Sequence, residues 1–177
     1  MHRQGLVLSV FTSGLLLGAL LSALVLWTAS GLLSPAPAHW RHGALLACAL
    51  LCVLRDTGLL RLALPQNARQ IPQHVLHRHL LGGALQFGFE LGTGVRTYLS
   101  ASTPYALAAA VLLHGGLLPA LLAGSGFALG RAATPALRLA SGAPSAWDAR
   151  LTARLPALKV SAGTSLTLAL AALLLLT

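Results

Sequence analysis

Few residues of this chain could carry chemistry, and the acidic residue Glu90 lies in the middle of an apolar stretch. Gln86 lies four residues before Glu90, and Thr93 lies three residues after it. Spacings of three and four residues bring side chains to one face of a helix. The sequence therefore predicts a polar helix face centred on Glu90. A carboxylate in apolar surroundings can exchange a proton or anchor a cationic or hydrogen-bonding group.

Three more ionisable residues fall at a comparable predicted depth. If the chain turns back near Ser102, Glu90 and His114 lie twelve residues on either side of that turn. Arg55 and Asp56 reach a similar level, about 18 Å into the second apolar stretch at 1.5 Å per helical residue. We expect these groups to form one buried polar cluster. Such a cluster could be a proton or ion relay or a substrate-anchoring site. It could equally be a salt bridge that only fixes helix register.

The composition indicates which elements must position these residues. Of the 177 residues, 56% are hydrophobic and 8% are charged, whereas a soluble domain carries about 25% charged residues. Apolar stretches of roughly 20 residues suit helices that cross a bilayer. The predicted fold is an all-α integral membrane helical bundle of about five transmembrane helices. We expect one polytopic domain over residues 1–177, with spans at about 5–31, 43–64, 80–100, 104–129 and 157–176.

The predicted boundaries depend on a few residues. Only twelve apolar residues precede Arg55, so the second span is extended to residue 64, before Pro65. Pro104 suits the first turn of a helix, which places a tight turn just before it. Gly115-Gly116 then predicts a kink within the fourth span. A signal peptide is an alternative for the first stretch, although its apolar core is about twice the usual length.

Small residues suggest how helices pack. Gly14, Gly18 and Ser22 recur every four residues and could line a close helix contact. Gly88 and Gly92 could do the same. The alternative for Gly92-Thr93-Gly94 is a broken helix of the kind that lines the substrate sites of transporters.

Basic residues predict orientation and partners. Twelve Lys and Arg face three acidic residues, a net charge of +9. Most of them lie near the N-terminus or in the linkers 66–79 and 130–156. The positive-inside rule predicts a cell-membrane protein with a cytoplasmic N-terminus and an external C-terminus. Expected partners are the bilayer, anionic lipid headgroups at the basic linkers, and other membrane subunits or a second copy. Nucleic acid is excluded, because no basic motif is interleaved with aromatic residues.

Common catalytic motifs are absent from the sequence. It has no nucleophile elbow, phosphate-binding Gly-Lys-Ser/Thr loop, zincin motif or close carboxylate pair. A non-enzymatic protein without cofactor or metal is favoured, although enzymatic activity is left open. Cys48 and Cys52 lie four residues apart in an apolar stretch. They are interpreted as packing residues, with membrane thiol redox chemistry as a less favoured alternative.

Residues 82–98, followed by Ser102-Thr103-Pro104-Tyr105, resemble a segment of small bacterial polytopic membrane proteins. The same stretch distantly resembles transmembrane electron carriers of the DsbD/CcdA type. That resemblance implies transfer of reducing equivalents across a membrane. Those carriers have a cysteine after their Thr-Pro, where this chain has Tyr105, and typically six spans. No catalytic residue is carried over.

The sequence leaves two main functional hypotheses. In the first, the chain is a small transporter-like or carrier subunit, with Glu90 central and His114, Arg55 and Asp56 supporting it. In the second, it is a non-transporting assembly or anchoring subunit whose polar helix faces bind partner helices.

Overall fold

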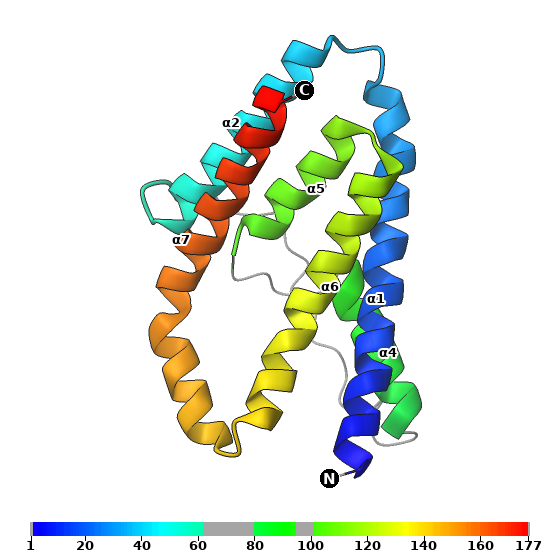
Figure 1. Cartoon of the computed structure of the whole chain (residues 1–177), viewed down its shortest axis with the longest axis vertical. Coiled ribbons are helices and arrows are strands. Elements are labelled where there is room, and N and C mark those ends of the chain that lie inside the picture. The colour runs from blue at the N-terminus through cyan, green and yellow to red at the C-terminus, as the bar shows by residue number, and fades with distance from the viewer. Residues whose placement is uncertain (1, 62–79, 95–100, 177) are drawn as a thin grey trace.

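The computed structural model describes residues 2–61, 80–94 and 101–176, and these residues form helices and turns without any strand (Figure 1). The predicted all-α class is therefore confirmed for this part of the chain. The elements are α1 His2–Ser30, the short 3-10 helix η1 Gly31–Leu33, α2 Ala38–Asp56, α4 Leu80–Thr93, α5 Thr103–His114, α6 Leu117–Ala140 and α7 Pro144–Leu176.

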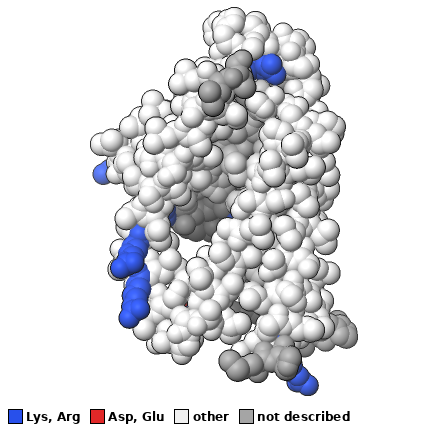
Figure 2. All heavy atoms as spheres, in the orientation of Figure 1, with Lys and Arg blue, Asp and Glu red and all other residues white. Residues whose placement is uncertain are grey.

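Within the described ranges, three stretches are long and apolar enough to cross a bilayer: Arg3–Leu33, Leu117–Ala140 and Pro144–Leu175. Only 6% of the most apolar window of the third is buried, so its apolar side chains lie on the outside. The face drawn in Figure 2 is almost entirely uncharged, with basic side chains toward its ends and along one edge. Such a surface suits lipid better than water, and the fold is compatible with a membrane protein.

The helices run nearly along one common axis (Figure 1). α1, α5 and α7 run toward the end where the C-terminus lies, with α5 starting part-way along the bundle, and α2 and α6 run in the opposite direction. The contacts of α4 show that it lies parallel to α1, because Gly88 lies beside Phe11 and Gly92 beside Ala19. The chain therefore begins and finishes at opposite ends of the bundle.

The contact between α1 and α4 is built on glycines from both helices. A Cβ added at Gly18 would collide with the carbonyl oxygen of Phe89, and one added at Gly92 would collide with that of Leu15. Only glycine lets two helix backbones approach this closely. The small-residue contacts predicted from the sequence are confirmed, and the structure shows that the two glycine stripes meet each other.

Two apolar clusters hold the remaining helices together. One joins α1 to α6, and the other joins α2, α5 and α7. α5 lies between them and contacts α1, α2, α6 and α7. The cluster residues are Leu15, Ala19, Ala128 and Ala132 in the first, and Leu45, Ala49, Ala106, Ala110 and Leu170 in the second.

The helix predicted over residues 43–64 is wrong at both ends, because α2 starts at Ala38 and ends at Asp56. Gly58 adopts a left-handed conformation with φ 83°, which stops the helix in the way that a glycine after the last turn usually does. The Asp56 side chain is used in a contact with α5 that is described below. Residues 62–64 of the predicted span lie outside the described residues.

The boundary predicted between the third and fourth spans is also wrong. α4 and α5 run in the same direction, so they are not the two arms of a hairpin. The chain reverses instead at Gly115, where a kink was expected. Gly115 has φ 79°, and its N–H donates to the carbonyl oxygen of Val111, which ends α5 with a left-handed cap. Pro119 lies in the first turn of α6, where a missing N–H costs little.

The last helix begins at Pro144 instead of near residue 157, because the proline at position 144 fits the first helical turn. The segment containing Trp147 is therefore part of α7. Arg138 near the end of α6 makes a bidentate ion pair with Asp148 of α7, with Nε–Oδ1 at 2.8 Å and the second nitrogen at 2.9 Å from Oδ2. This pair closes the turn between the two helices.

Candidate functional site

The candidate site lies where α4 stops and α5 starts. α4 ends at Thr93, whose carbonyl oxygen accepts a hydrogen bond of 3.2 Å from Ser22 Oγ on α1. Gly94 follows with φ 69°, a conformation that ends a helix at little cost only for glycine. α5 resumes at Thr103 in the same direction. The two helices therefore follow one another along the bundle with an interruption between them.

The start of α5 is held by the carboxylate of Asp56. The Ser102 N–H lies 2.8 Å from Asp56 Oδ2 and 3.1 Å from Oδ1, and the Ser102 hydroxyl donates to Oδ1 at 2.8 Å. The Asp56 side chain is 2% exposed, and Ser102 is fully buried. A carboxylate is stabilised at a helix N-terminus, because unpaired N–H groups and the helix dipole both favour negative charge there.

Arg55 completes this group. One of its guanidinium nitrogens lies 3.2 Å from Asp56 Oδ1 and donates to Ser102 Oγ at 2.9 Å. Arg55 is in the last turn of α2, where a cation is favoured by the helix dipole. The structure thus brings Arg55 and Asp56 together as predicted. Their hydrogen bonds to Ser102 connect the end of α2 to the start of α5.

Glu90 and Gln86 form a separate group on α4. Gln86 Nε2 donates to Glu90 Oε1 at 3.0 Å, and Thr93 Oγ1 donates to the Glu90 carbonyl oxygen at 2.8 Å. Glu90 is half-buried and Gln86 is exposed. By helical spacing, both lie on the side of α4 opposite the glycines that contact α1.

The predicted proximity of Glu90 and His114 is wrong, because the chain reverses after His114 and not before Pro104. His114 ends α5 beside Gly115, whose environment includes Ser30 Oγ and Arg41. Ser30 is twelve residues beyond the level at which α1 contacts the α4 turn containing Glu90, which is about 18 Å along the helix. The six candidate residues therefore fall into three groups: Arg55 with Asp56, Gln86 with Glu90 and Thr93, and His114 apart from both.

A cavity of about 480 Å³ lies beside the interruption. It is bounded by α1, the last turn of α4, residues 104–111 of α5, and α6. Among the described residues that line it, most are apolar or glycine, and the polar side chains are Ser22, Thr93 and Tyr105. Its volume falls within the range of about 300–1,000 Å³ that is typical of small-molecule sites.

Sequence reasoning missed both the cavity and the role of Ser102. The alternative interpretation of Gly92-Thr93-Gly94 as a broken helix could have predicted a cavity there. A serine directly before Thr103-Pro104 was a usable signal for a helix start at Ser102, because Ser caps helices and Pro favours the first turn. Pairing of Ser102 with Asp56 spans 46 residues and had no local signal.

The described ranges contain no group of three or more His, Cys, Asp or Glu side chains that could hold a metal ion. The histidines of the linker 66–79 lie outside those ranges. Cys48 and Cys52 are half-buried thiols on α2 that are not joined in a disulfide.

Comparison of the chain with protein-family models, curated proteins and solved structures finds no match. The resemblance of residues 82–105 to DsbD/CcdA-type carriers is therefore neither supported nor opposed, and function is inferred from the geometry of the interruption and its cavity.

Proposed function

We propose that the chain is a small membrane protein of five crossings, in which α4 and α5 together make a discontinuous third crossing, and that it works as a carrier-type transport subunit. α1, α6 and α7 account for three crossings. α2 begins at the end where α1 finishes, and α4 begins at the opposite end (Figure 1). The chain between them must therefore cross once more.

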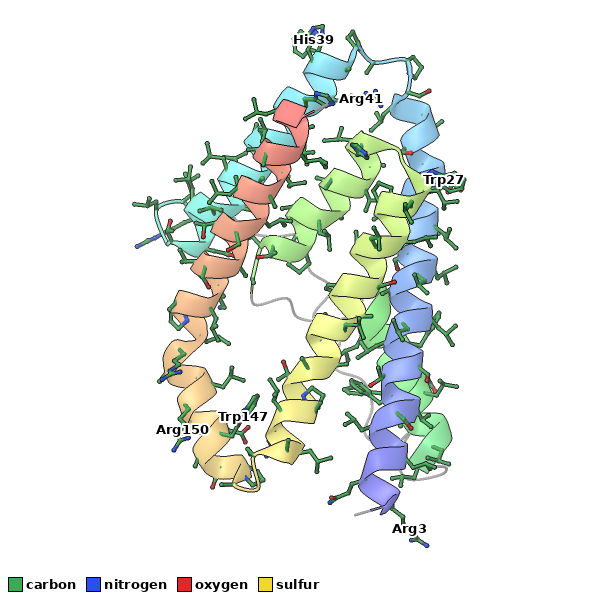
Figure 3. All side chains as sticks on the ribbon, in the orientation of Figure 1. Arg3, Trp27, His39, Arg41, Trp147 and Arg150 are labelled. Carbon is green, nitrogen blue, oxygen red and sulfur yellow. The ribbon has the colours of Figure 1, made fainter. Side chains whose placement is uncertain are left out.

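The charge distribution supports an N-terminus in the cytoplasm. Arg3 and Arg150 lie at one end of the bundle, and His39 and Arg41 lie at the other (Figure 3). Arg138 and Arg154, near the α6–α7 turn, add to the first end. Excess Lys and Arg marks the cytoplasmic side of short loops. The cell membrane is then the proposed location, with the C-terminus outside.

The observation that carries the proposal is the helix interruption beside a cavity. Interrupted helices at mid-membrane are how many transporters present a substrate site, with the two half-helices as separate parts. Here α5 is held at its start by Asp56 and ends in the left-handed cap at Gly115, so it can move as a short rigid unit. A carrier needs such a unit, because transport requires two alternative packings of the same helices.

The exposed polar side of α4 favours a second candidate function. Gln86 is exposed next to Glu90 on a helix that is otherwise apolar. Polar groups facing lipid are costly, and a partner helix or a second copy of the chain would satisfy them. In that case the protein would be an assembly or anchoring subunit.

Distance measurements between spin labels distinguish the two candidates. Nitroxides at Leu6 of α1, which is exposed, and at Leu112 of α5, which is half-buried, would be attached in a Cys48→Ser, Cys52→Ser background. The protein would be reconstituted in lipid vesicles and measured by double electron–electron resonance. A carrier should give two distance populations for this pair, since it samples two conformations.

The control pair is Leu6 on α1 and Leu129 on α6, both exposed, on helices joined by the buried cluster around Leu15 and Ala128. This pair should give one distance. A single narrow distance for both pairs would refute the carrier and favour the assembly subunit.

A further inference from the structure

The cavity lies along one side of α1, and α4 covers only the first part of that side. On α1, Gly14, Gly18, Ser22 and Leu26 recur every four residues on one side. α4 lies against the first two of these positions and ends beside Ser22. Leu26 and the neighbouring Val25 line the cavity. The cavity is therefore the continuation of the α4 groove beyond the end of α4, and its inner wall is the buried side of α1 and α6.

The wall of the cavity selects against polar occupants. Ser22 and Thr93 already donate their hydroxyl hydrogens to backbone carbonyl oxygens. They can therefore offer only acceptor lone pairs to a ligand. Tyr105 is the third polar side chain among the described lining residues, and the others are apolar or glycine and include Ala23, Val111 and Phe127. An ion or a sugar would lose most of its hydration there and find few polar groups to replace it, which costs several kcal/mol or more. A hydrocarbon chain would lose nothing of that kind.

The mouth of the cavity faces the membrane side of α1. Leu21 and Val25 line the cavity and are also 49% and 58% exposed. In a helix that crosses a bilayer, exposed leucine and valine contact lipid tails. An occupant can therefore enter sideways from the hydrocarbon region without passing through water.

We infer that the cavity binds a single hydrocarbon chain that enters laterally from the bilayer. This inference names the ligand class of the proposed carrier and rests on that function. The chain lies between α1 and α5 with its far end against Phe127 of α6. Both an acyl chain of a phospholipid and the chain of a free fatty acid have this chemistry.

Photocrosslinking tests the inference. The full-length protein would be reconstituted in vesicles that contain either a phosphatidylcholine or a free fatty acid, each with a diazirine in its hydrocarbon chain. After illumination, adducts would be located by peptide mass spectrometry. Adducts on Ala23 and Val111, which are 4% and 5% exposed, are expected from at least one probe. Lipid around the outside of the bundle cannot label these buried residues, so the probe that labels them identifies the source of the chain.

Two matched variants make the result decisive. Ala123→Phe fills the cavity from α6, and Ala133→Phe adds the same side chain at an exposed position of the same helix that does not line the cavity. We expect adducts on Ala23 and Val111 to fall at least fivefold in the first variant and to be unchanged in the second. Absence of adducts from both probes, or an equal fall in both variants, overturns the inference.

The outcome is separable from that of the spin-label experiment. Two distance populations without cavity adducts would retain the carrier and reject the hydrocarbon ligand. Cavity adducts with a single distance would show a lipid site in a protein that is not a carrier.

Discussion

Replacing Asp56 by alanine should weaken the fold more than any change to an exposed charge. The carboxylate accepts hydrogen bonds from the backbone N–H and the hydroxyl of Ser102 and from Arg55, and it is 2% exposed. Asp56→Ala would leave the start of α5 without its acceptor and the arginine without its counter-ion. Removing one partner of a buried ion pair costs about 3–5 kcal/mol.

The expected loss of stability is smaller for this pair than for a fully buried one. The Arg55 side chain is 22% exposed and keeps its hydrogen bond to Ser102, so part of its charge remains solvated. We therefore expect Asp56→Ala to lower the free energy of unfolding by about 2–3 kcal/mol, below the fully buried range. Asp56→Asn retains one oxygen acceptor but loses the charge, and it should cost about 1–2 kcal/mol, close to the difference between charged and neutral hydrogen bonds.

The measurement is reversible unfolding in mixed micelles with increasing dodecyl sulfate, followed by circular dichroism. Asp148→Asn is the control, because this carboxylate also pairs with an arginine, but both side chains are about half exposed (48% and 49%). It should show no measurable change, since exposed pairs contribute little. If Asp56→Ala stays within about 0.5 kcal/mol of wild type, as ordinary surface substitutions do, the buried connection between α2 and α5 does not stabilise the fold.

Three further predictions follow from the helix contacts and ends. Gly18→Ala should destabilise the protein by about 1–3 kcal/mol in the same unfolding assay, the usual cost of overpacking, because the new Cβ meets the Phe89 carbonyl oxygen. The control Gly126→Ala, with open space around it, should not destabilise the protein. Equal losses of stability in the two variants would contradict the close α1–α4 contact. Gly115→Ala should cost about 1–2 kcal/mol, the price of a left-handed non-glycine residue, since φ is 79° there; no loss would mean that the turn relaxes. Reporter tags on the two termini should appear on opposite sides of the membrane in a protease-protection assay, and tags on the same side would exclude five crossings.

Sequence patterns were sufficient for the fold class, because composition alone requires apolar helices. They were also sufficient for the glycine contacts, since a spacing of four places Gly14 and Gly18 on one helix face whatever their partner. The chain direction around Pro104 could not be read in this way. Proline is equally suited to a helix that starts after a reversal and to one that resumes after an interruption. Only the later left-handed glycine at position 115 shows where the chain turns.

The candidate site was predictable in its residue types but not in its grouping. Arg55 and Asp56 are adjacent, so their association required no knowledge of the fold. The contact of Asp56 with Ser102 depends on how α2 and α5 pack against each other. The sequence around each residue does not predict that packing. The predicted pairing of Glu90 with His114 depended on a hairpin at Ser102, and it fails because the reversal occurs at Gly115.

The position of the interruption follows from the residues of α1. Two helix backbones stay as close as α1 and α4 only where both present glycine, as at Gly14 and Gly18. The next two positions on the same side of α1 are Ser22 and Leu26. Their side chains would prevent so close an approach if α4 continued in the same direction along α1. Ser22 instead donates a hydrogen bond to the carbonyl oxygen of Thr93, one of the carbonyl groups that an ending helix leaves unpaired. The change from glycine to serine along α1 thus both ends the close contact and satisfies the end of α4, and the larger residues beyond it are left to line the cavity.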